Sequence, residues 1–402
     1  MAGERGRVGA ARAAETAGAE PQQLFTLTEV PRPAPNWRDR VARTAPVSGP
    51  LAIFGAATLC HVLALWPISR IQNTTVTGLL MKWDAGWYLK LAQQGYPTHL
   101  PPRAHMSSTA GFYPLYPLLV RGLIHGSAIH GAGASITVAI VTSALALVVV
   151  WQLAARLCDE GVAYRAVALT AFAPGAFVLS MGYSEGLLLL FASATLLMLL
   201  DRRWLLAGIC AGLACLARPT GVAAAVACAV AAFVALREYR RDLRPLLAPV
   251  LAGIGAVTLP IYHLIHTGDA LAYWKTQKYG WHESFDFGLS TLRSFAKWTT
   301  HPLRDVNILF ASLAFIVLVA GIVLLVRWRP PAPVTAYALT IAVLTIGASS
   351  YASTFRFVLI GVPFTIAFAR ALRHMTFAIG LACSAALFTM LAITATTLYY
   401  TP

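Results

Sequence analysis

The sequence predicts an all-α polytopic membrane protein, a bundle of about eleven transmembrane helices. Of its 402 residues, 58% are hydrophobic and only 12% are charged, and the mean hydropathy is +0.66. A soluble domain of this size needs more charge than this to cover its surface. Apolar runs of about 17 residues or more, long enough to cross roughly 30 Å of hydrocarbon, recur along the chain.

Eleven apolar segments are the expected spans. The fifth is short for a full crossing, so we expect it to be half-buried or extended by Arg218. The segments lie at 48–67, 134–155, 163–182, 184–200, 204–217, 221–236, 246–266, 307–326, 333–349, 357–373 and 376–398.

The chain divides into a tail, 1–47, and a transmembrane domain, 48–402. The tail has no apolar stretch and is rich in Ala, Arg, Glu and Pro, which predicts a disordered cytosolic segment without a cleavable signal peptide. With the tail in the cytosol, 19 of the 31 Lys and Arg residues fall on that side, close to helix ends. The positive-inside rule favours this orientation.

This orientation places two long loops, 68–133 and 267–306, on the outer side of the membrane. Long loops in a compact protein are usually functional or disordered, and their many aromatic residues argue against disorder. The net charge of +15 is explained by orientation in the bilayer, and aromatic stacking platforms beside basic stripes are absent, so we expect no nucleic-acid partner. The six cysteines support neither a disulfide framework nor a zinc site.

Asp84 is the most conspicuous acidic residue of the first loop. Trp83, Trp87 and Tyr88 fall on one face of a predicted helix that would lie along the membrane surface. A partly desolvated carboxylate beside two tryptophans is suited to accept a proton from a hydroxyl group at the interface. A helix cap, or an ion-pair partner for Lys82, is the alternative explanation.

The segment 111–121 contains Tyr113 and Tyr116 and is interrupted by two prolines. It is too short to span, so we expect a re-entrant or interfacial segment that shapes a cavity, with Arg121 at its polar edge. An aromatic belt at the membrane surface explains the same residues equally well.

Three further charged residues lie at the outer ends of predicted spans. Glu185 would be an interfacial residue, orient an acceptor, or pair with a cation in a cavity. Arg218 and Arg356 each stand alone between apolar segments, and two guanidinium groups facing one cavity would bind a phosphate. The alternative for each arginine is contact with lipid headgroups.

Several motifs resemble the PIG-V mannosyltransferase family and occur in the same order along residues 50–373. They are the runs 83–88, 95–97, 112–119, 184–186, 217–221 and 268–273, together with Arg356-Phe357. The composition, rich in Ala and Arg, suggests a bacterial member of high G+C content, in which a GPI anchor would not be the acceptor. Phe112-Tyr113 departs mildly from the two phenylalanines that are common at this place in the family.

The resemblance implies a GT-C-type fold, with interfacial helices in the first outer loop and a catalytic acid there, matched by Asp84. It further implies mannosyl transfer from a polyprenyl-phosphate donor, by an inverting displacement, to a glycolipid or envelope glycan at the outer face of a bacterial plasma membrane. Arg218 and Arg356 would bind the donor phosphate. Trp83, Trp87, Tyr113, Tyr116 and Glu185 would shape the acceptor site.

No cofactor is expected, although Asp84 and Glu185 could share a divalent metal ion. The competing class is a lipid or glycolipid transporter or flippase, for which repeated halves and polar residues near mid-membrane would be typical. Neither feature is visible in the sequence, and the polar groups gather at the outer interface. A non-catalytic scaffold is a third possibility.

Overall fold

The computed structural model describes residues 47–238, 241–302, 305–349 and 353–397. Within these ranges the chain is almost entirely helical, and the β-type contact that occurs there is an isolated bridge between Phe285 and Ala348. The all-α fold class is therefore confirmed. The predicted tail, 1–47, lies outside the described residues except for Val47.

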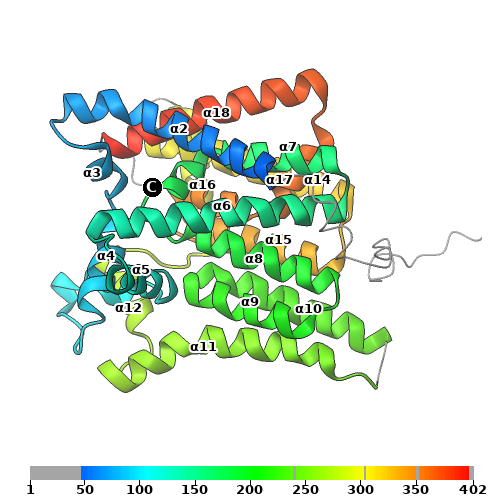
Figure 1. The fold of residues 1–402 in the computed structure, drawn as a ribbon, viewed down its shortest axis with the longest axis horizontal. Helices are drawn as coiled ribbons and strands as arrows, with labels where there is room; N and C mark the ends of the chain where they lie inside the picture. Colours follow the sequence, from blue (N-terminus) through cyan, green and yellow to red (C-terminus); the bar gives the residue numbers. More distant parts are fainter. Residues whose placement is uncertain (1–46, 239–240, 303–304, 350–352, 398–402) are drawn as a thin grey trace, which may run out of the picture.

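Six helices are long and apolar enough to cross a membrane. Each coincides with a predicted span and runs roughly along the horizontal axis of Figure 1. They are α2 (Ser48–Ile71), α6 (Gly131–Leu157), η5 with α10 (Pro219–Gly221 and Val222–Glu238), η6 with α11 (Arg244–Leu246 and Leu247–Thr267), α14 (Val306–Trp328) and α18 (His374–Thr396).

Two further spans are broken helices. α7 (Glu160–Ala171) meets η4 (Pro174–Ser180) at 78°, and α16 (Thr354–Ile360) meets α17 (Val362–Ala371) at 77°. A proline in the first turn of η4 and another in the first turn of α17 suit these bends, because proline lacks the N–H that would continue the preceding helix.

Three shorter apolar helices complete the bundle: α8 (Glu185–Leu200), α9 (Trp204–Ala217) and α15 (Ala332–Gly347). Every predicted span thus coincides with a helix or a bent pair. By length and composition, six to eight of these elements could cross a membrane. The figure of eleven crossings stays a prediction.

The two long loops are helical and lie at one end of the bundle, on the left of Figure 1. The first loop holds α3 (Val76–Leu80), α4 (Asp84–Gln94), η2 (Arg103–His105), η3 (Thr109–Gly111) and α5 (Leu115–Gly126). The second holds α12 (Ala272–Gly280) and α13 (Leu289–Thr300). We call this end the loop end.

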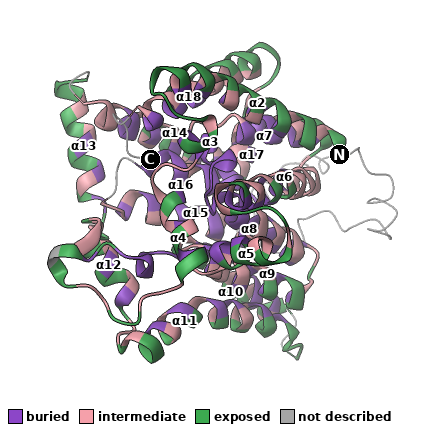
Figure 2. Ribbon diagram, turned by 60° about the vertical axis from the view of Figure 1, so that its left-hand side comes forward, coloured by how far each residue is buried: buried purple, intermediate pink, exposed green. Residues whose placement is uncertain are grey.

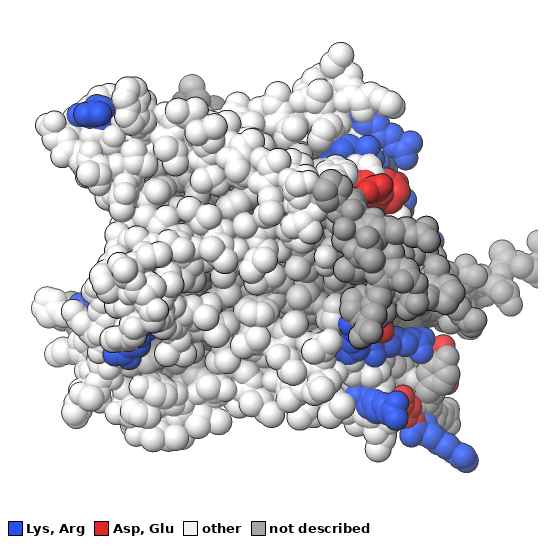
Figure 3. All heavy atoms as spheres, in the orientation of Figure 1, with Lys and Arg blue, Asp and Glu red and all other residues white. Residues whose placement is uncertain are grey.

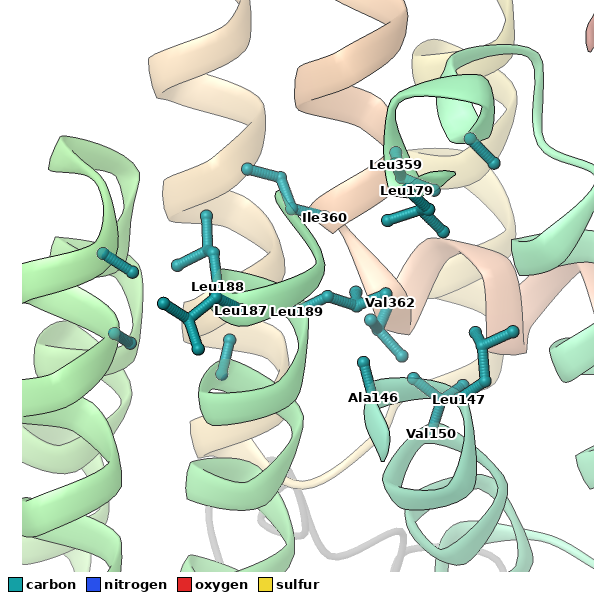
Figure 4. Close-up of a cluster of buried hydrophobic side chains, with 14 of the residues drawn as sticks. Ala146, Leu147, Val150, Leu179, Leu187, Leu188, Leu189, Leu359, Ile360 and Val362 are labelled. Atoms are coloured by element: carbon teal, nitrogen blue, oxygen red, sulfur yellow. The ribbon is translucent and has the colours of Figure 1, made fainter. Parts of the chain in front are cut away.

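One cluster of the buried core lies where α6, η4, α8, α16 and α17 meet. Figure 4 shows its side chains, and those labelled are Ala146, Leu147, Val150, Leu179, Leu187, Leu188, Leu189, Leu359, Ile360 and Val362. Because lipid tails are as apolar as these side chains, close packing rather than the hydrophobic effect holds the helices together here. The core therefore fixes the starting points of α8 and α16 relative to each other.

The outer faces of the bundle are apolar. On α11, five exposed residues follow one another at helical spacing, namely Val250, Ile254, Val257, Ile261 and Leu264, and Figure 2 shows the exposed side of this helix in green. In Figure 3 a few Lys and Arg side chains lie at the loop end, and more of them, together with Asp and Glu, lie at the opposite end. An apolar band between charged ends is what a bilayer-spanning protein presents to lipid.

Candidate active site

Four charged residues from four segments meet at the loop end. Asp84 opens α4, Glu185 opens α8, Arg218 follows α9, and Arg356 lies in α16. The residues are up to 272 positions apart in the chain. We call these four residues the charged network.

Arg356 links the two carboxylates. Its Nη2 atom lies 2.8 Å from Oδ2 of Asp84 and 2.5 Å from Oε1 of Glu185, while its Nε donates to the same Oε1 at 2.7 Å. Its guanidinium carbon also lies 4.8 Å from the centre of the Tyr183 ring, a cation–π contact. The Arg356 guanidinium group thus lies between Asp84 and Glu185, the two residues that the sequence analysis considered as ligands of a shared metal ion.

Arg218 binds Glu185 from the other side. Its Nη1 atom lies 3.0 Å from Oε1 of Glu185 and donates to the hydroxyls of Ser184 and Tyr88 at 3.3 and 3.4 Å. The prediction that Arg218 and Arg356 are isolated cations is therefore wrong, because both pair with Glu185. These ion pairs join segments that are far apart in the chain, and the apolar pattern of the sequence did not reveal such tertiary contacts.

The two carboxylates differ in their access to solvent. The side chain of Asp84 is 28% exposed, whereas that of Glu185 is 1% exposed. Oε2 of Glu185 is buried and has no hydrogen-bond partner. Of the two acids, Asp84 is therefore the one that a substrate could reach.

The backbone next to Asp84 is unusual. Trp83 has φ +59°, a conformation that non-glycine residues rarely adopt and that costs on the order of 1–3 kcal/mol. The Trp83 indole N–H donates to the carbonyl of Ala395 in α18 at 2.8 Å, and the Asp84 amide donates to the Tyr183 hydroxyl at 3.3 Å. These contacts hold the start of α4 where its carboxylate meets Arg356.

Neither alternative explanation for Asp84 fits. Asp84 lies in the first turn of α4 rather than at the N-cap, which is Trp83. The Lys82 ammonium donates to the Gln72 side chain and to the carbonyl of Thr396, so its hydrogen bonds go to α2 and α18. Arg356 is the ion-pair partner of Asp84.

An aromatic cluster covers the first loop beside the charged network. Trp87 stacks on Phe112 with ring centres 6.1 Å apart, and both rings meet Trp281 of the second loop edge-on at 5.5 Å. Gly111 permits this contact, because a Cβ atom there would lie 2.5 Å from the Trp281 ring. The two long loops therefore pack against each other.

The tyrosines of segment 111–121 have different positions. Tyr113 is buried and contacts Tyr273 of the second loop. Tyr116 is fully buried and donates to the carbonyl of Ser135 at 2.7 Å, so it fixes α5 to α6.

The sequence analysis did not identify three polar residues that belong to the site. Tyr88, Tyr183 and Ser184 surround the charged network through the contacts given above. Burial raises the pKa of Tyr88 to about 12. Their place within four residues of Asp84 or Glu185 in the sequence was the available signal.

The described residues contain no group of three or more His, Cys, Asp or Glu side chains that could hold a metal ion.

Comparison with known proteins gives a family match. The family model described as "Glycosyltransferase family 87" matches residues 112–354, more than half of the chain. No curated protein matches the chain. The sequence resemblance to the PIG-V family is confirmed at the level of the enzyme class, and the mannosyl specificity that it implied stays a prediction.

Among solved structures, the chain resembles the oligosaccharyltransferase of Archaeoglobus fulgidus. Its apo form matches with a TM-score of 0.49 and 15% identity, over 87% of this chain and 56% of that one. The form tethered to an acceptor peptide matches with a TM-score of 0.47 and 14% identity, over 88% and 56%. This chain thus spans little more than half the length of those structures.

Proposed function

The chain belongs to glycosyltransferase family 87, and from this membership we propose that it transfers mannose from a polyprenyl-phosphate donor to a glycolipid or envelope glycan. We place the reaction at the outer face of a bacterial plasma membrane, with the N-terminus in the cytosol. The observation that carries the proposal is the charged network, in which an accessible carboxylate and two guanidinium groups meet at the loop end.

In the proposed reaction Asp84 is the general base. The acceptor hydroxyl gives its proton to the carboxylate, and its oxygen attacks the anomeric carbon of the donor sugar. The bond from that carbon to the phosphate oxygen breaks, and the lipid phosphate leaves with the bonding electron pair. This is a single inverting displacement, and it needs no second carboxylic acid because the phosphate leaves already ionised.

We assign different roles to the two arginines. The Arg218 side chain is 12% exposed and is the better placed to neutralise charge on the leaving phosphate. The Arg356 guanidinium is engaged by two carboxylates, so we propose that it mainly orients Asp84, with contact to the phosphate as a secondary role. Glu185 would hold both arginines in place.

The transporter alternative is not favoured by membership of a glycosyltransferase family. The two classes make different predictions in a reconstituted system. Purified protein in vesicles would be given radiolabelled polyprenyl-phosphate mannose and an extract of envelope lipids. An enzyme transfers label to the extract, whereas a flippase moves the donor across the bilayer without forming a product. Movement without transfer would contradict our proposal.

A further inference from the structure

A second feature of the loop end is an apolar cavity that the charged network does not use. Its volume is about 280 Å³. Its walls come from α4, α5, α9 and α11, and representative residues are Leu91, Leu118, Arg121, Leu216, Thr258 and Tyr262. We call it the α5 groove.

The groove has one charged side chain in its wall, that of Arg121. Arg121 is exposed, and no Asp or Glu of the described residues forms an ion pair with it. Apolar walls with a single guanidinium group are complementary to an anionic amphiphile, because the guanidinium group binds phosphate oxygens in a bidentate way. The chemistry therefore indicates a lipid with a phosphate group.

The groove is open to the hydrocarbon around the bundle. Leu118 of α5, in the groove wall, is 57% exposed, and Val257 and Ile261, close to the groove residue Thr258 on α11, belong to that helix's exposed apolar face. A lipid in the surrounding bilayer could thus enter sideways, without passing through water.

The groove begins beside the charged network. Leu216 precedes Arg218 by two residues, and Leu91 lies about one helical turn beyond Tyr88 on α4. From Asp84 to the groove residues of α4, Leu91 and Ala92, the helix rises by about 10–12 Å. A lipid in the groove would therefore carry its phosphate well away from the carboxylate, and only an extended headgroup would reach Asp84.

This separation distinguishes the two lipid substrates. The phosphate of a polyprenyl-phosphate sugar is bonded directly to the reacting carbon, so it must lie at the charged network. A donor bound in this way would make no contact with Arg121. An acceptor can have its phosphate far from the reacting hydroxyl. We propose that the α5 groove holds the apolar chains of the acceptor, a phospholipid-anchored glycan whose phosphate binds Arg121. This proposal rests on the function proposed above.

Photo-crosslinking tests the groove without turnover. The protein would be placed in nanodiscs that contain a diazirine-labelled phosphatidylglycerol or the matching phosphatidylcholine, and crosslinked peptides would be identified by mass spectrometry. We expect the anionic probe to label α5 and α11 preferentially. Arg121→Gln should reduce that labelling by about tenfold, the contribution of one hydrogen bond to a charged group, and Arg121→Lys should retain part of it.

Two internal controls make the result specific. The apolar hollow between α2 and α6, lined by Leu51, Leu59 and Ile140 among others, has no charged side chain, so both probes should label it equally. Leu118→Trp should fill the groove and exclude the probe, whereas Leu119→Trp, outside the lining, should not. Melting temperatures show whether each variant is folded.

Three results would overturn the proposal. Equal labelling by both probes would mean that the groove holds bulk lipid. Displacement of the probe by polyprenyl phosphate would assign the groove to the donor. The third result is kinetic and uses an envelope lipid extract as acceptor. Arg121→Gln should raise KM for the extract about tenfold and leave KM for the donor unchanged. An unchanged KM for the extract would contradict the proposal. Because labelling needs no transfer, intact labelling without product would contradict the proposed function instead.

Discussion

Arg356 and Asp84 form an ion pair of 2.8 Å between segments at opposite ends of the chain. The side chain of Arg356 is 4% exposed and that of Asp84 is 28% exposed. The pair therefore has a buried cation and a carboxylate that faces solvent. This arrangement holds the direction of the carboxylate while one of its edges stays accessible.

Asp84→Asn should reduce sugar transfer by about 10²–10⁴-fold, the usual contribution of a general base, because the amide keeps the shape but cannot take a proton. Turnover with polyprenyl-phosphate mannose is the measurement, and melting temperature is the folding control. Asp269→Asn is the matched variant, since Asp269 pairs with Lys275 in the second loop, away from the charged network. Near-parental turnover of Asp84→Asn would remove the basis of the mechanism.

Arg218→Ala should lower activity with the lipid-phosphate donor while the protein stays folded. We expect a fall in kcat/KM for the donor of at least tenfold, since a charge-assisted hydrogen bond to phosphate is lost. Arg70→Ala is the control. Arg70 is an exposed arginine in the last turn of α2, where its guanidinium group contacts the Trp66 ring. Equal kinetics for the two variants would indicate that Arg218 has only a structural or headgroup-anchoring role.

Glu185→Gln should destabilise the protein by about 3–5 kcal/mol, because it leaves two guanidinium groups without their shared buried carboxylate. Glu238→Gln removes an ion pair whose side chains are 39% and 28% exposed, and should cost no more than about 1 kcal/mol. Chemical denaturation in detergent compares the two. Similar losses of stability would show that burial does not set the strength of the charged network.

Gly175→Ala should damage the site from a distance. A Cβ atom at Gly175 would lie 2.4 Å from the carbonyl oxygen of Phe355 and 2.9 Å from the amide of Arg356, so η4 and α16 would have to separate. We expect lower turnover and a lower melting temperature. Gly253→Ala meets no atom within 4 Å and should be neutral or stabilising by up to about 1 kcal/mol. Parental activity in Gly175→Ala would show that the position of α16 can vary freely.

Membrane orientation can be measured with an impermeant thiol reagent. A cysteine at Lys278, in the second long loop, should be labelled from outside intact cells, and a cysteine at Asp242, in the link before α11, should be labelled only after permeabilisation. Both variants are made in a chain without its native cysteines. The reverse pattern would place the loop end, and the site, in the cytosol.

The sequence predicted the helices well because their apolar runs are long and their links are short. The charged network was less predictable. Asp84 was identified from its tryptophan neighbours, but its pairing with Arg356 is a contact between segments 272 residues apart, and two spans, α7 with η4 and α16 with α17, are bent. Hydropathy shows where an apolar run lies, and it shows neither that the run is broken nor which distant segment it contacts. For this reason Arg218 and Arg356 looked unpaired.

The contacts between the start of α4 and the end of α18 have a consequence for biosynthesis. The indole of Trp83 and the ammonium of Lys82 bind the carbonyls of Ala395 and Thr396, more than 300 residues later in the chain. At about 5–20 residues per second, a ribosome needs roughly 15–60 s to make the intervening segment. During that time the helix that carries Asp84 is already synthesised but has no final anchor. The proposed catalytic centre is therefore completed only after α18 has been made, so chains that stop before α18 would be inactive.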